Sequence, residues 1–515
     1  MNRTLAAAFA SAVLLAGVAL LALANHTPSK RPPRPPVVVV LILDEFPLDS
    51  MLGPEGQIDA ERYPNFARLA ATSNWYEHAT TVFDSTFKAV PAILDARLPA
   101  KGSKPDARSH PRNVYTLFDG LGYKVVDVES AEALCVPTIC AGHRIRRPGV
   151  LDRLRDGGRP ARLHRWVRSI QPSSRRTLYV SHVLFPHEPW IYLPSGHQSR
   201  PAGLDPVQDL NNPRGFHDPD LSLHNHARYL LQLGYVDREL GVLMDHLERQ
   251  GLFDKALLAV TADHGYAFQM GLDDRRMVVP SNIDKIAPVP LFLKRPGQRT
   301  GHVNSEYVQT IDIVPTLADV LAAPLDWSHD GRSLLRPRPT SREVSMITRD
   351  FKNTVRLDTR TIELRRRAER EHWAQVFLTG SESRARFGHP WASVYRVGPN
   401  TDLLDRRVGL VARAPDNALL ANAHLWRDVS RSRQILPTRV TGELLGHAKP
   451  GVRRDLAAAV NGRIHAVGRS FYLKGDSREW FSLIVPEGSL RDGANRVELF
   501  QVLPGGRLLR LAREP

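Results

Sequence analysis

The sequence predicts an α/β protein, with a doubly wound, mostly parallel sheet flanked by helices and a smaller C-terminal β-rich unit. Residues 37–43 are seven consecutive Val, Leu or Ile residues, the pattern of a central strand buried on both faces. Strand-like and helix-like segments alternate from there to about residue 335, which favours crossover helices between parallel strands. After about residue 460, short strand-like runs are separated by Gly-containing turns, which is typical of antiparallel β structure.

The elements are expected in the following order. Further strands of the main sheet are expected at 124–128, 178–185, 257–262 and 289–293, and helices at 61–73, 114–121, 228–250 and 315–322. Helix 228–250 has the clearest pattern, because its apolar residues recur with the helical period and Gly251 ends it. In the C-terminal unit, strands are expected at 463–473, 480–485, 497–503 and 508–511, with turns at Asn461-Gly462 and Gly505-Gly506.

We divide the chain into residues 1–36, a main domain of residues 37–340 and a basic, partly β-rich region of residues 341–515. Residues 5–24 contain no charge and are numerous enough to span a bilayer. They end in Ala22-Leu23-Ala24, a signal-peptidase pattern, so a cleaved signal peptide and a single N-terminal membrane anchor both remain open. Either one predicts an extracytoplasmic protein, secreted or membrane-anchored.

Two cysteines and the charge distribution bear on compartment and partners. Cys135 and Cys140 form a short, even pair, which favours an exported disulfide over two free thiols. The formal net charge is +16, and residues 331–515 hold 34 Lys and Arg against 19 Asp and Glu, a net of +15. We expect no nucleic-acid partner, because interleaved aromatics and a recognition motif are absent from the sequence. The basic excess fits contact with anionic lipid or cell-envelope polymer.

Two of the predicted buried strands end in polar pairs, Asp44-Glu45 and Asp263-His264. Sites in open α/β sheets form outside the carboxyl ends of the strands, so these pairs are expected to meet. Carboxylates and one imidazole are suitable ligands for a divalent cation. Either pair alone has an ordinary explanation, as a cap or a turn. Together they predict a metal site with at least one ion, whose identity (Mn, Zn, Mg or Ca) stays open.

A segment rich in hydroxyl groups, residues 80–94, lies between these pairs. From Thr86 onward its apolar residues have helical spacing, so a hydroxyl is expected at a helix N-terminus. Ser and Thr are common there simply as caps. The same backbone N–H groups and helix dipole would also stabilise an alkoxide and a bound phosphate or sulfate. Ser85 is the neighbouring alternative.

At this point the chain resembles the sulfatase and alkaline phosphatase superfamily, over roughly residues 37–335. The resemblance rests on six segments in the family's order: Leu41-Ile42-Leu43-Asp44-Glu45, Thr86 with Pro91-Ala92-Ile93-Leu94, Phe185-Pro186-His187-Glu188-Pro189-Trp190, Val260-Thr261-Ala262-Asp263-His264-Gly265, Pro290 to Gly297 and Ile311 to Leu317. Thr86 stands where sulfatases carry the cysteine that becomes formylglycine. Phosphoethanolamine transferases and lipoteichoic acid synthases carry threonine there.

The resemblance implies a role for each matching position. Asp44, Glu45, Thr86, Asp263 and His264 would be metal ligands, and Thr86 would also be the nucleophile. The transferase relatives use one acid at the first strand, which leaves the pair Asp44 and Glu45 less certain. In the same alignment, His187 would bind the substrate anion or protonate the leaving group, and the candidate substrate-binding residues are Arg275, Arg276 and His302.

One departure from the family decides the reaction class. Formylglycine formation requires Cys or Ser, then Pro or Ala two residues on and Arg four residues on. Counted from Ser85 those places hold Phe87 and Ala89, and counted from Thr86 they hold Lys88 and Val90. The prediction is therefore an exported metal-dependent hydrolase or transferase of phosphate esters or diesters that uses Thr86. The alternatives are a sulfuric ester hydrolase without formylglycine and a non-catalytic envelope protein that binds anionic polymer.

Overall fold

The computed structural model describes residues 36–129, 132–140, 158–201, 217–272, 274–337, 341–446, 452–473 and 475–514. The predicted signal or anchor lies outside these residues. Within the described ranges, no helix combines the length and apolar character needed to cross a bilayer.

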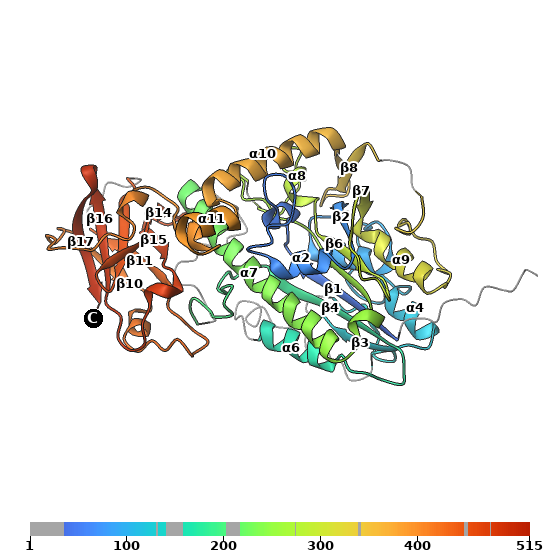
Figure 1. The fold of residues 1–515 in the computed structure, drawn as a ribbon. Coiled ribbons are helices and arrows are strands. Elements are labelled where there is room, and N and C mark those ends of the chain that lie inside the picture. The colour runs from blue at the N-terminus through green and yellow to red at the C-terminus, as the bar shows by residue number, and fades with distance from the viewer. Residues whose placement is uncertain are drawn as a thin grey trace, which may run out of the picture.

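The main domain begins with a long α/β unit. Its elements are β1 (Val37–Asp44), η1 (Leu48–Met51), α2 (Pro64–Ala70), β2 (Asn74–Thr80), α3 (Thr86–Asp95), α4 (Val114–Gly120), β3 (Lys124–Val128), α6 (Arg159–Ser169), β4 (Thr177–Pro186), α7 (Pro219–Arg249), η2 (Phe253–Lys255), β5 (Leu257–Ala262), α8 (Ile283–Ile286), β6 (Leu291–Lys294), β7 (His302–Gln309), η3 (Thr310–Asp312) and α9 (Ile313–Val320). Figure 1 shows the helices on both faces of the central sheet.

Seven strands form this sheet in the order β3-β4-β1-β5-β6-β2-β7. Strand β1 is central and parallel to both of its neighbours, β4 and β5. Strand β3 is parallel to β4, and β2 is parallel to β7, whereas β6 runs antiparallel to β5 and β2. The predicted doubly wound, mostly parallel sheet is confirmed.

The two faces of the sheet follow from the alternation of side chains along β1. Its even-numbered residues pack with apolar side chains of α3, α4 and α9, and its odd-numbered residues pack with those of α2, α6 and α7. All eight residues of β1 are buried, as expected for a strand covered by helices on both sides.

The predicted elements of this domain are present with shifted bounds. The helix expected at 228–250 begins earlier, at Pro219, where Asp218 caps it by accepting the N–H of Leu221. The helix expected at 61–73 is shorter and spans Pro64–Ala70. Strands β2 and β7 are not predicted, because polar residues interrupt both sequences and β7 is an exposed edge strand.

Residues 341–387 pack against the α/β unit. They form the hairpin of β8 (Glu343–Ile347) and β9 (Thr354–Asp358), followed by α10 (Thr359–Phe377) and α11 (Gly380–Phe387). In Figure 1, α10 lies along the domain next to α8 and β8. The buried Arg366 of α10 holds Asp49 of η1 through two hydrogen bonds of 2.9 and 3.1 Å. The division of the chain at residue 340 stays a prediction.

The C-terminal unit consists of two antiparallel sheets. One has the order β10 (Asn417–Leu420), β11 (Arg439–Leu445), β15 (Glu479–Ile484), β14 (Phe471–Tyr472), and the other β13 (Arg463–Arg469), β12 (Asp455–Val460), β16 (Val497–Leu503), β17 (Arg507–Glu514). The predicted turns lie between β12 and β13 and between β16 and β17. Figure 1 shows this unit beside α11. A hydrogen bond of 2.8 Å between Ser482 and His224 joins it to α7.

The predicted disulfide between Cys135 and Cys140 is present. Both residues pack in the apolar cluster on the α3–α4–α9 face of the sheet. Asn113, the N-cap of α4, also holds this segment by donating from its side chain to the carbonyl of Leu134 at 3.3 Å.

We expect the double substitution Cys135→Ser, Cys140→Ser to lower the free energy of unfolding by about 2 kcal/mol. This is the low end for disulfides, because the closed loop is short and its unfolded state loses little entropy. Denaturant unfolding of the exported protein measures the change. Alkylation without reductant is the companion measurement, and two reactive thiols in the wild-type protein would contradict the bond.

Candidate active site

The candidate site lies where β1 and β5 end. Asp44 is the last residue of β1, and Asp263 directly follows the last residue of β5. The two strands are parallel neighbours, and the N–H of Asp263 continues their ladder by donating to the carbonyl of Leu43 at 2.9 Å. Both carboxyl groups are fully buried. Burial raises the pKa of Asp44 and of Asp263 to about 6.

Local hydrogen bonds orient Asp263 and His264. The backbone N–H groups of Glu45 and His264 donate to Oδ1 of Asp263 at 3.1 and 2.6 Å. Nδ1 of His264 donates to the carbonyl of Gly265 at 2.8 Å, so Nε2 carries the lone pair. That nitrogen lies 3.4 Å from Oδ2 of Asp263, which is buried and has no hydrogen-bond partner among the described residues. Two lone pairs that face each other at this distance repel unless a proton or a metal cation lies between them.

Thr86 is the first residue of α3, as predicted, and its side chain is nearly buried. Oγ1 of Thr86 lies 3.5 Å from Oδ1 of Asp44 and 3.4 Å from Nε2 of His264. Ser85 precedes the helix as its N-cap and makes no side-chain capping hydrogen bond. Of the two predicted hydroxyl groups, it is therefore that of Thr86 that joins the acid group.

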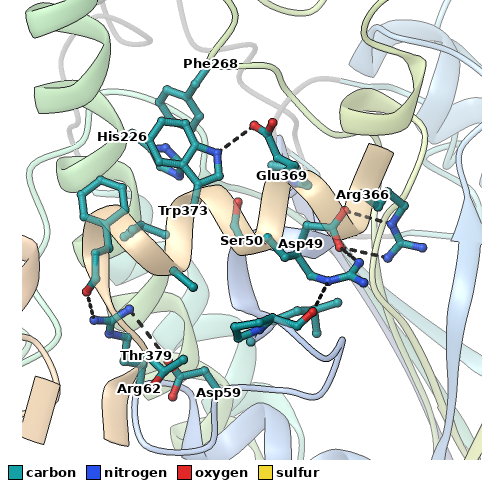
Figure 2. Close-up of a pocket in the computed structure, with 18 of the residues that line it drawn as sticks. Asp49, Ser50, Asp59, Arg62, His226, Phe268, Arg366, Glu369, Trp373 and Thr379 are labelled. Carbon is teal, nitrogen blue, oxygen red and sulfur yellow. Dashed lines mark hydrogen bonds and ion pairs between the residues drawn. The ribbon is translucent and has the colours of Figure 1, made fainter. Parts of the chain in front are cut away.

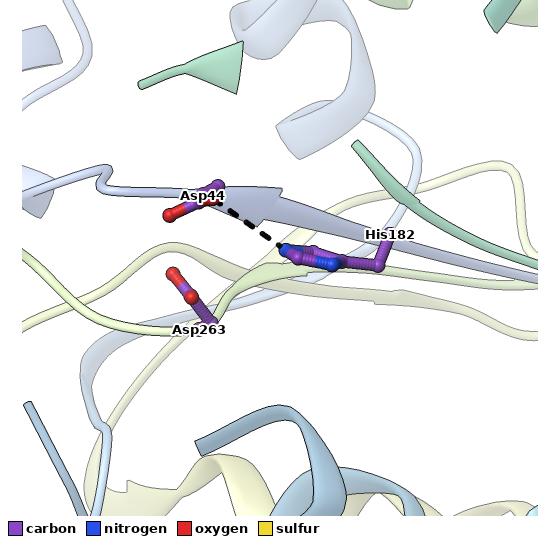
Figure 3. A group of neighbouring side chains, drawn as sticks. All are labelled: Asp44, His182 and Asp263. Atoms are coloured by element: carbon purple, nitrogen blue, oxygen red, sulfur yellow. Dashed lines mark ion pairs between the residues drawn. The ribbon is translucent and has the colours of Figure 1, made fainter. Parts of the chain in front are cut away.

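His182 is a further residue of this group, and sequence reasoning missed it. It lies in β4, the other parallel neighbour of β1, and its Nε2 is 3.9 Å from Oδ2 of Asp44. Asp44, Asp263 and His182 together form a buried cluster of metal-ligand type. Figure 3 shows the ring edge of His182 directed at the two carboxylates. The sequence signal that could have found it is a single histidine within the mostly apolar strand β4. This strand pairs with β1, the strand that ends in Asp44.

Glu45 lies in a second group, among the basic side chains of Arg275, Arg276 and His187. Its carboxylate accepts two hydrogen bonds of 3.0 and 3.2 Å from the buried Arg275 and lies 3.6 Å from Nε of Arg276. Nε2 of His187 lies 3.5 Å from the same carboxylate. Burial alone would raise the pKa of Glu45, but Arg275, with help from His187 and Arg276, holds it well below its usual range. The predicted pair Asp44 and Glu45 is thus divided between two groups.

The backbone explains this division. Glu45 has a φ of 59°, in the left-handed region that non-glycine residues rarely adopt. Its N–H donates to Asp263, and its carbonyl accepts the hydroxyl of Tyr229 at 3.1 Å. The turn therefore sends two consecutive carboxylates in different directions, one toward Thr86 and one toward the guanidinium groups.

His302 reaches neither the acidic group around Asp44 nor the basic group around Glu45. Its prediction as a substrate-binding residue is therefore corrected. It is exposed at the start of β7, where it pairs with Asn74 at the amino end of β2. Asp44 and Asp263 stand at carboxyl ends of strands, so His302 lies toward the opposite edge of the sheet. None of the six family segments includes this position, so the sequence offered no motif to locate it.

Arg349 connects the loops that carry Thr86 and Arg275. Its Nε donates to Oδ1 of the fully buried Asp84 at 2.9 Å, and its Nη1 donates to Asp274. Oδ2 of Asp84 accepts the N–H of Val278 at 2.9 Å. The hairpin of β8 and β9 thereby fixes the start of α3 relative to the two arginines.

A separate pocket of about 810 Å³, measured to its open mouth, lies between η1, α7 and α10. Figure 2 shows an aromatic wall formed by His226, Phe268 and Trp373, and the paired charges of Asp49 and Arg366. None of the predicted site residues lines this pocket. Because its charged groups pair within the pocket, Asp49 with Arg366 and Glu369 with Lys285, we do not assign the reaction to it.

Comparisons with known proteins give the following matches. Residues 161–323 match the sulfatase family model. Arylsulfatase K of Bos taurus is 31% identical over 127 residues, which is 25% of this chain and 22% of the relative. Choline-sulfatase of Rhizobium meliloti (strain 1021) is 27% identical over 202 residues, 34% of this chain and 38% of the relative. The solved phosphonate monoester hydrolase SpPMH from Silicibacter pomeroyi has 17% identity and a TM-score of 0.44, covering 60% of this chain and 79% of that chain.

The chain therefore spans between about a fifth and two fifths of the length of these curated relatives. The family match includes His187, Asp263 and His264, but it begins at residue 161, after Asp44 and Thr86. The assignment of Asp44 and Thr86 to the candidate site therefore depends on the ordered sequence motifs and on the geometry described above. Over residues 161–323 the chain is thus similar to the sulfatase family, in agreement with the resemblance seen in the sequence motifs.

Proposed function

We propose that this protein is an exported, metal-dependent ester hydrolase or transferase that acts on phosphate esters or diesters through Thr86. One observation carries the proposal: Oγ1 of Thr86 lies between a carboxylate and an imidazole lone pair, at the N-terminus of a helix. The disulfide supports export, because such bonds persist in oxidising compartments.

The donor set fits one divalent cation. Asp44, Thr86, Asp263 and His264 would hold it, and three successive contacts between their ligand atoms measure 3.4 to 3.5 Å. Ligands at about 2.0–2.2 Å from a four-coordinate ion lie about 3.3–3.6 Å apart. The ion would supply two things, a lower pKa for the Thr86 hydroxyl and charge neutralisation on the transferred group.

The residues of the chain account for the rest of the reaction. Oγ1 of Thr86 would attack phosphorus as the ester P–O bond breaks, which leaves a phosphothreonine. The N–H groups at the start of α3 would stabilise the anionic group on it. Water or an acceptor hydroxyl would then displace Thr86. His187, whose Nδ1 donates to the carbonyl of Glu188 at 2.9 Å, would contact the substrate anion or protonate the leaving group.

The basic group next to Thr86 suits an anionic substrate. Arg275 and Arg276 bring two positive charges, and Glu45 provides one firmly ionised carboxylate. The second acid, Glu188, lies 3.5 Å from Arg275, yet burial raises its pKa to about 7. Burial also lowers the pKa of His187. The group therefore has an excess of positive charge around neutral pH.

Sulfuric ester hydrolysis is the second candidate function. Its support comes from the relatives, which include an arylsulfatase and a choline-sulfatase. The threonine at position 86 and the absence of the formylglycine pattern favour phosphate. Turnover of 4-nitrophenyl phosphate, bis(4-nitrophenyl) phosphate and 4-nitrophenyl sulfate by the purified protein separates the two, and no turnover of any would favour the non-catalytic alternative.

Metal removal should abolish turnover, and one of Mn²⁺, Zn²⁺, Mg²⁺ or Ca²⁺ should restore it. Asp263→Asn should also lose bound metal, because it weakens the ligand that faces His264. Elemental analysis of the purified variants measures this independently of activity. Asp237→Asn is the matched control, since Asp237 is a buried acid that accepts N–H groups of α2 instead. Full activity without metal would contradict the proposal.

Thr86→Ala should lower turnover by about three orders of magnitude or more, because it removes the attacking oxygen. Thr86→Ser should keep part of the activity, and the control Ser85→Ala should keep most of it. Rapid acid quenching with substrate, followed by peptide mass spectrometry, should find one phosphoryl group on Thr86. A sulfuryl group there would move the enzyme to the second candidate function. An adduct on Ser85 would show that the nucleophile is wrong.

The raised pKa of Glu188 predicts that the stability difference between the wild-type protein and Glu188→Gln depends on pH. A folded-state pKa of about 7, above the ordinary 4.5, means that stability is lost as the pH rises from about 4.5 to about 7. Glu188→Gln removes this loss. The free energy of unfolding of the variant, relative to that of the wild type, should therefore rise by up to about 3 kcal/mol between pH 4.5 and pH 8. Urea unfolding at both values measures it.

Glu363→Gln is the control with the opposite sign. His78 and Arg366 outweigh burial there and hold the pKa of Glu363 at about 2. That carboxylate contributes stability above pH 4.5, so this variant should lose stability relative to the wild type at pH 8. A flat difference for Glu188→Gln across the pH range would contradict the raised pKa.

A further inference from the structure

A second buried group of ligand-type side chains lies beside the candidate active site, at the carboxyl end of β3. Glu129 directly follows β3, and Glu132 comes three residues later. Because β3 is parallel to β4, the strand end places both acids beside His182. Nδ1 of His182 lies 3.2 Å from Oε2 of Glu132 and 3.6 Å from Oε2 of Glu129, and all three side chains are fully buried.

The two glutamates lack hydrogen bonds that would compensate their burial. Among the residues that the structure describes, no donor bonds to any of their four carboxylate oxygens. The nearby buried Asp127 differs, because it accepts the hydroxyl of Tyr115 at 2.7 Å. Burying two ionised carboxyl groups in this way raises the free energy of the folded state unless a positive charge lies next to them. In the described part of the chain, His182 is the one basic side chain in ion-pair contact with them.

We propose that Glu129, Glu132 and Nδ1 of His182 form a second divalent-cation site. Two carboxylates and one imidazole are the donor set that Zn²⁺ and Mn²⁺ accept. The spacings of 3.2 and 3.6 Å match those between ligands of one such ion, as in the first site. These three atoms are also mutually within reach of one ion.

The second site does not take a ligand from the first. Neutral imidazole has one N–H and one lone pair. If Nε2 of His182 carries the proton toward Asp44, 3.9 Å away, then Nδ1 presents its lone pair to the two glutamates. Metal-binding histidines commonly direct their other ring nitrogen toward a carboxylate, and Asp44 lies on that side of His182, beyond hydrogen-bond distance. The first ion keeps Asp44, Thr86, Asp263 and His264.

The position of this site indicates a supporting role. Its ligands come from β4 and from residues that follow β3, on the side of β1 away from β5, so the ion would not touch the substrate. It would instead fix His182, and through it the carboxylate of Asp44. It would also hold Glu132, three residues before the disulfide of Cys135 and Cys140. The rival arrangement uses a protonated His182 as the only positive charge.

Metal counting tests the proposal. We expect about two zinc ions per chain after loading with Zn²⁺ and gel filtration, and about one in Glu132→Gln. Asp263→Asn should also retain about one, which separates failure of this site from failure of the proposed active-site metal. Glu239→Gln is the matched control and should retain two, because Glu239 is a buried acid that pairs with His164 elsewhere. An unchanged zinc content in Glu132→Gln would overturn the proposal.

Anomalous diffraction at the zinc edge gives a measurement on the wild-type protein, in case a variant does not fold. A peak between Glu129, Glu132 and His182 supports the site. Crystals loaded with Zn²⁺ that show no peak there would overturn it, whether or not a peak appears between Asp44 and Asp263.

Discussion

The parallel alignment of β3, β4, β1 and β5 is the constraint on which the site depends. Four neighbouring strands point the same way, so their carboxyl ends deliver polar side chains to one edge of an otherwise apolar sheet. Along that edge, Glu129, His182, Asp44 and Asp263 follow one another in the order of the strands. No single strand carries this chemistry, because each contributes only one or two groups. The backbone ladder is therefore what sets the distances between them.

The left-handed backbone conformation of Glu45 separates this edge of the sheet into an acidic side and a basic side. On one side, buried acids and imidazole nitrogens face each other, an arrangement that suits the proposed cation. On the other, Arg275 and Arg276 outnumber the firmly ionised acids and favour an anion. Thr86 stands on the acidic side at the start of α3. A phosphate or sulfate group that reaches across both sides would meet a cation, a helix N-terminus and guanidinium groups at once.

The sequence predicted those features that depend on residues near one another in the chain. The buried run of β1, the periodic helix α7, the start of α3 at Thr86 and the short disulfide all appear as expected. Strand order is a different kind of information, since it depends on which distant segments pair. His182 and Glu132 were missed for that reason: each is unremarkable in its own segment and gains a partner only when β3 and β4 pair. His302 was misplaced because it lies outside the six family segments, and the sequence around it does not show at which edge of the sheet it stands.

The position of Thr86, the proposed nucleophile, also depends on a part of the chain beyond the family match. Arg349 comes from the hairpin of β8 and β9, and it neutralises Asp84 just before α3 and Asp274 just before the two arginines. Without Arg349, the fully buried carboxylate of Asp84 would keep, among the described residues, only the hydrogen bond from the N–H of Val278. An uncompensated buried carboxylate costs several kcal/mol, roughly 3–5, so both loops would shift to hydrate it. The geometry of Thr86 relative to the anion group is thus fixed by charge pairing as well as by the sheet, which explains how a threonine can be held in place where the sulfatase pattern around it is missing.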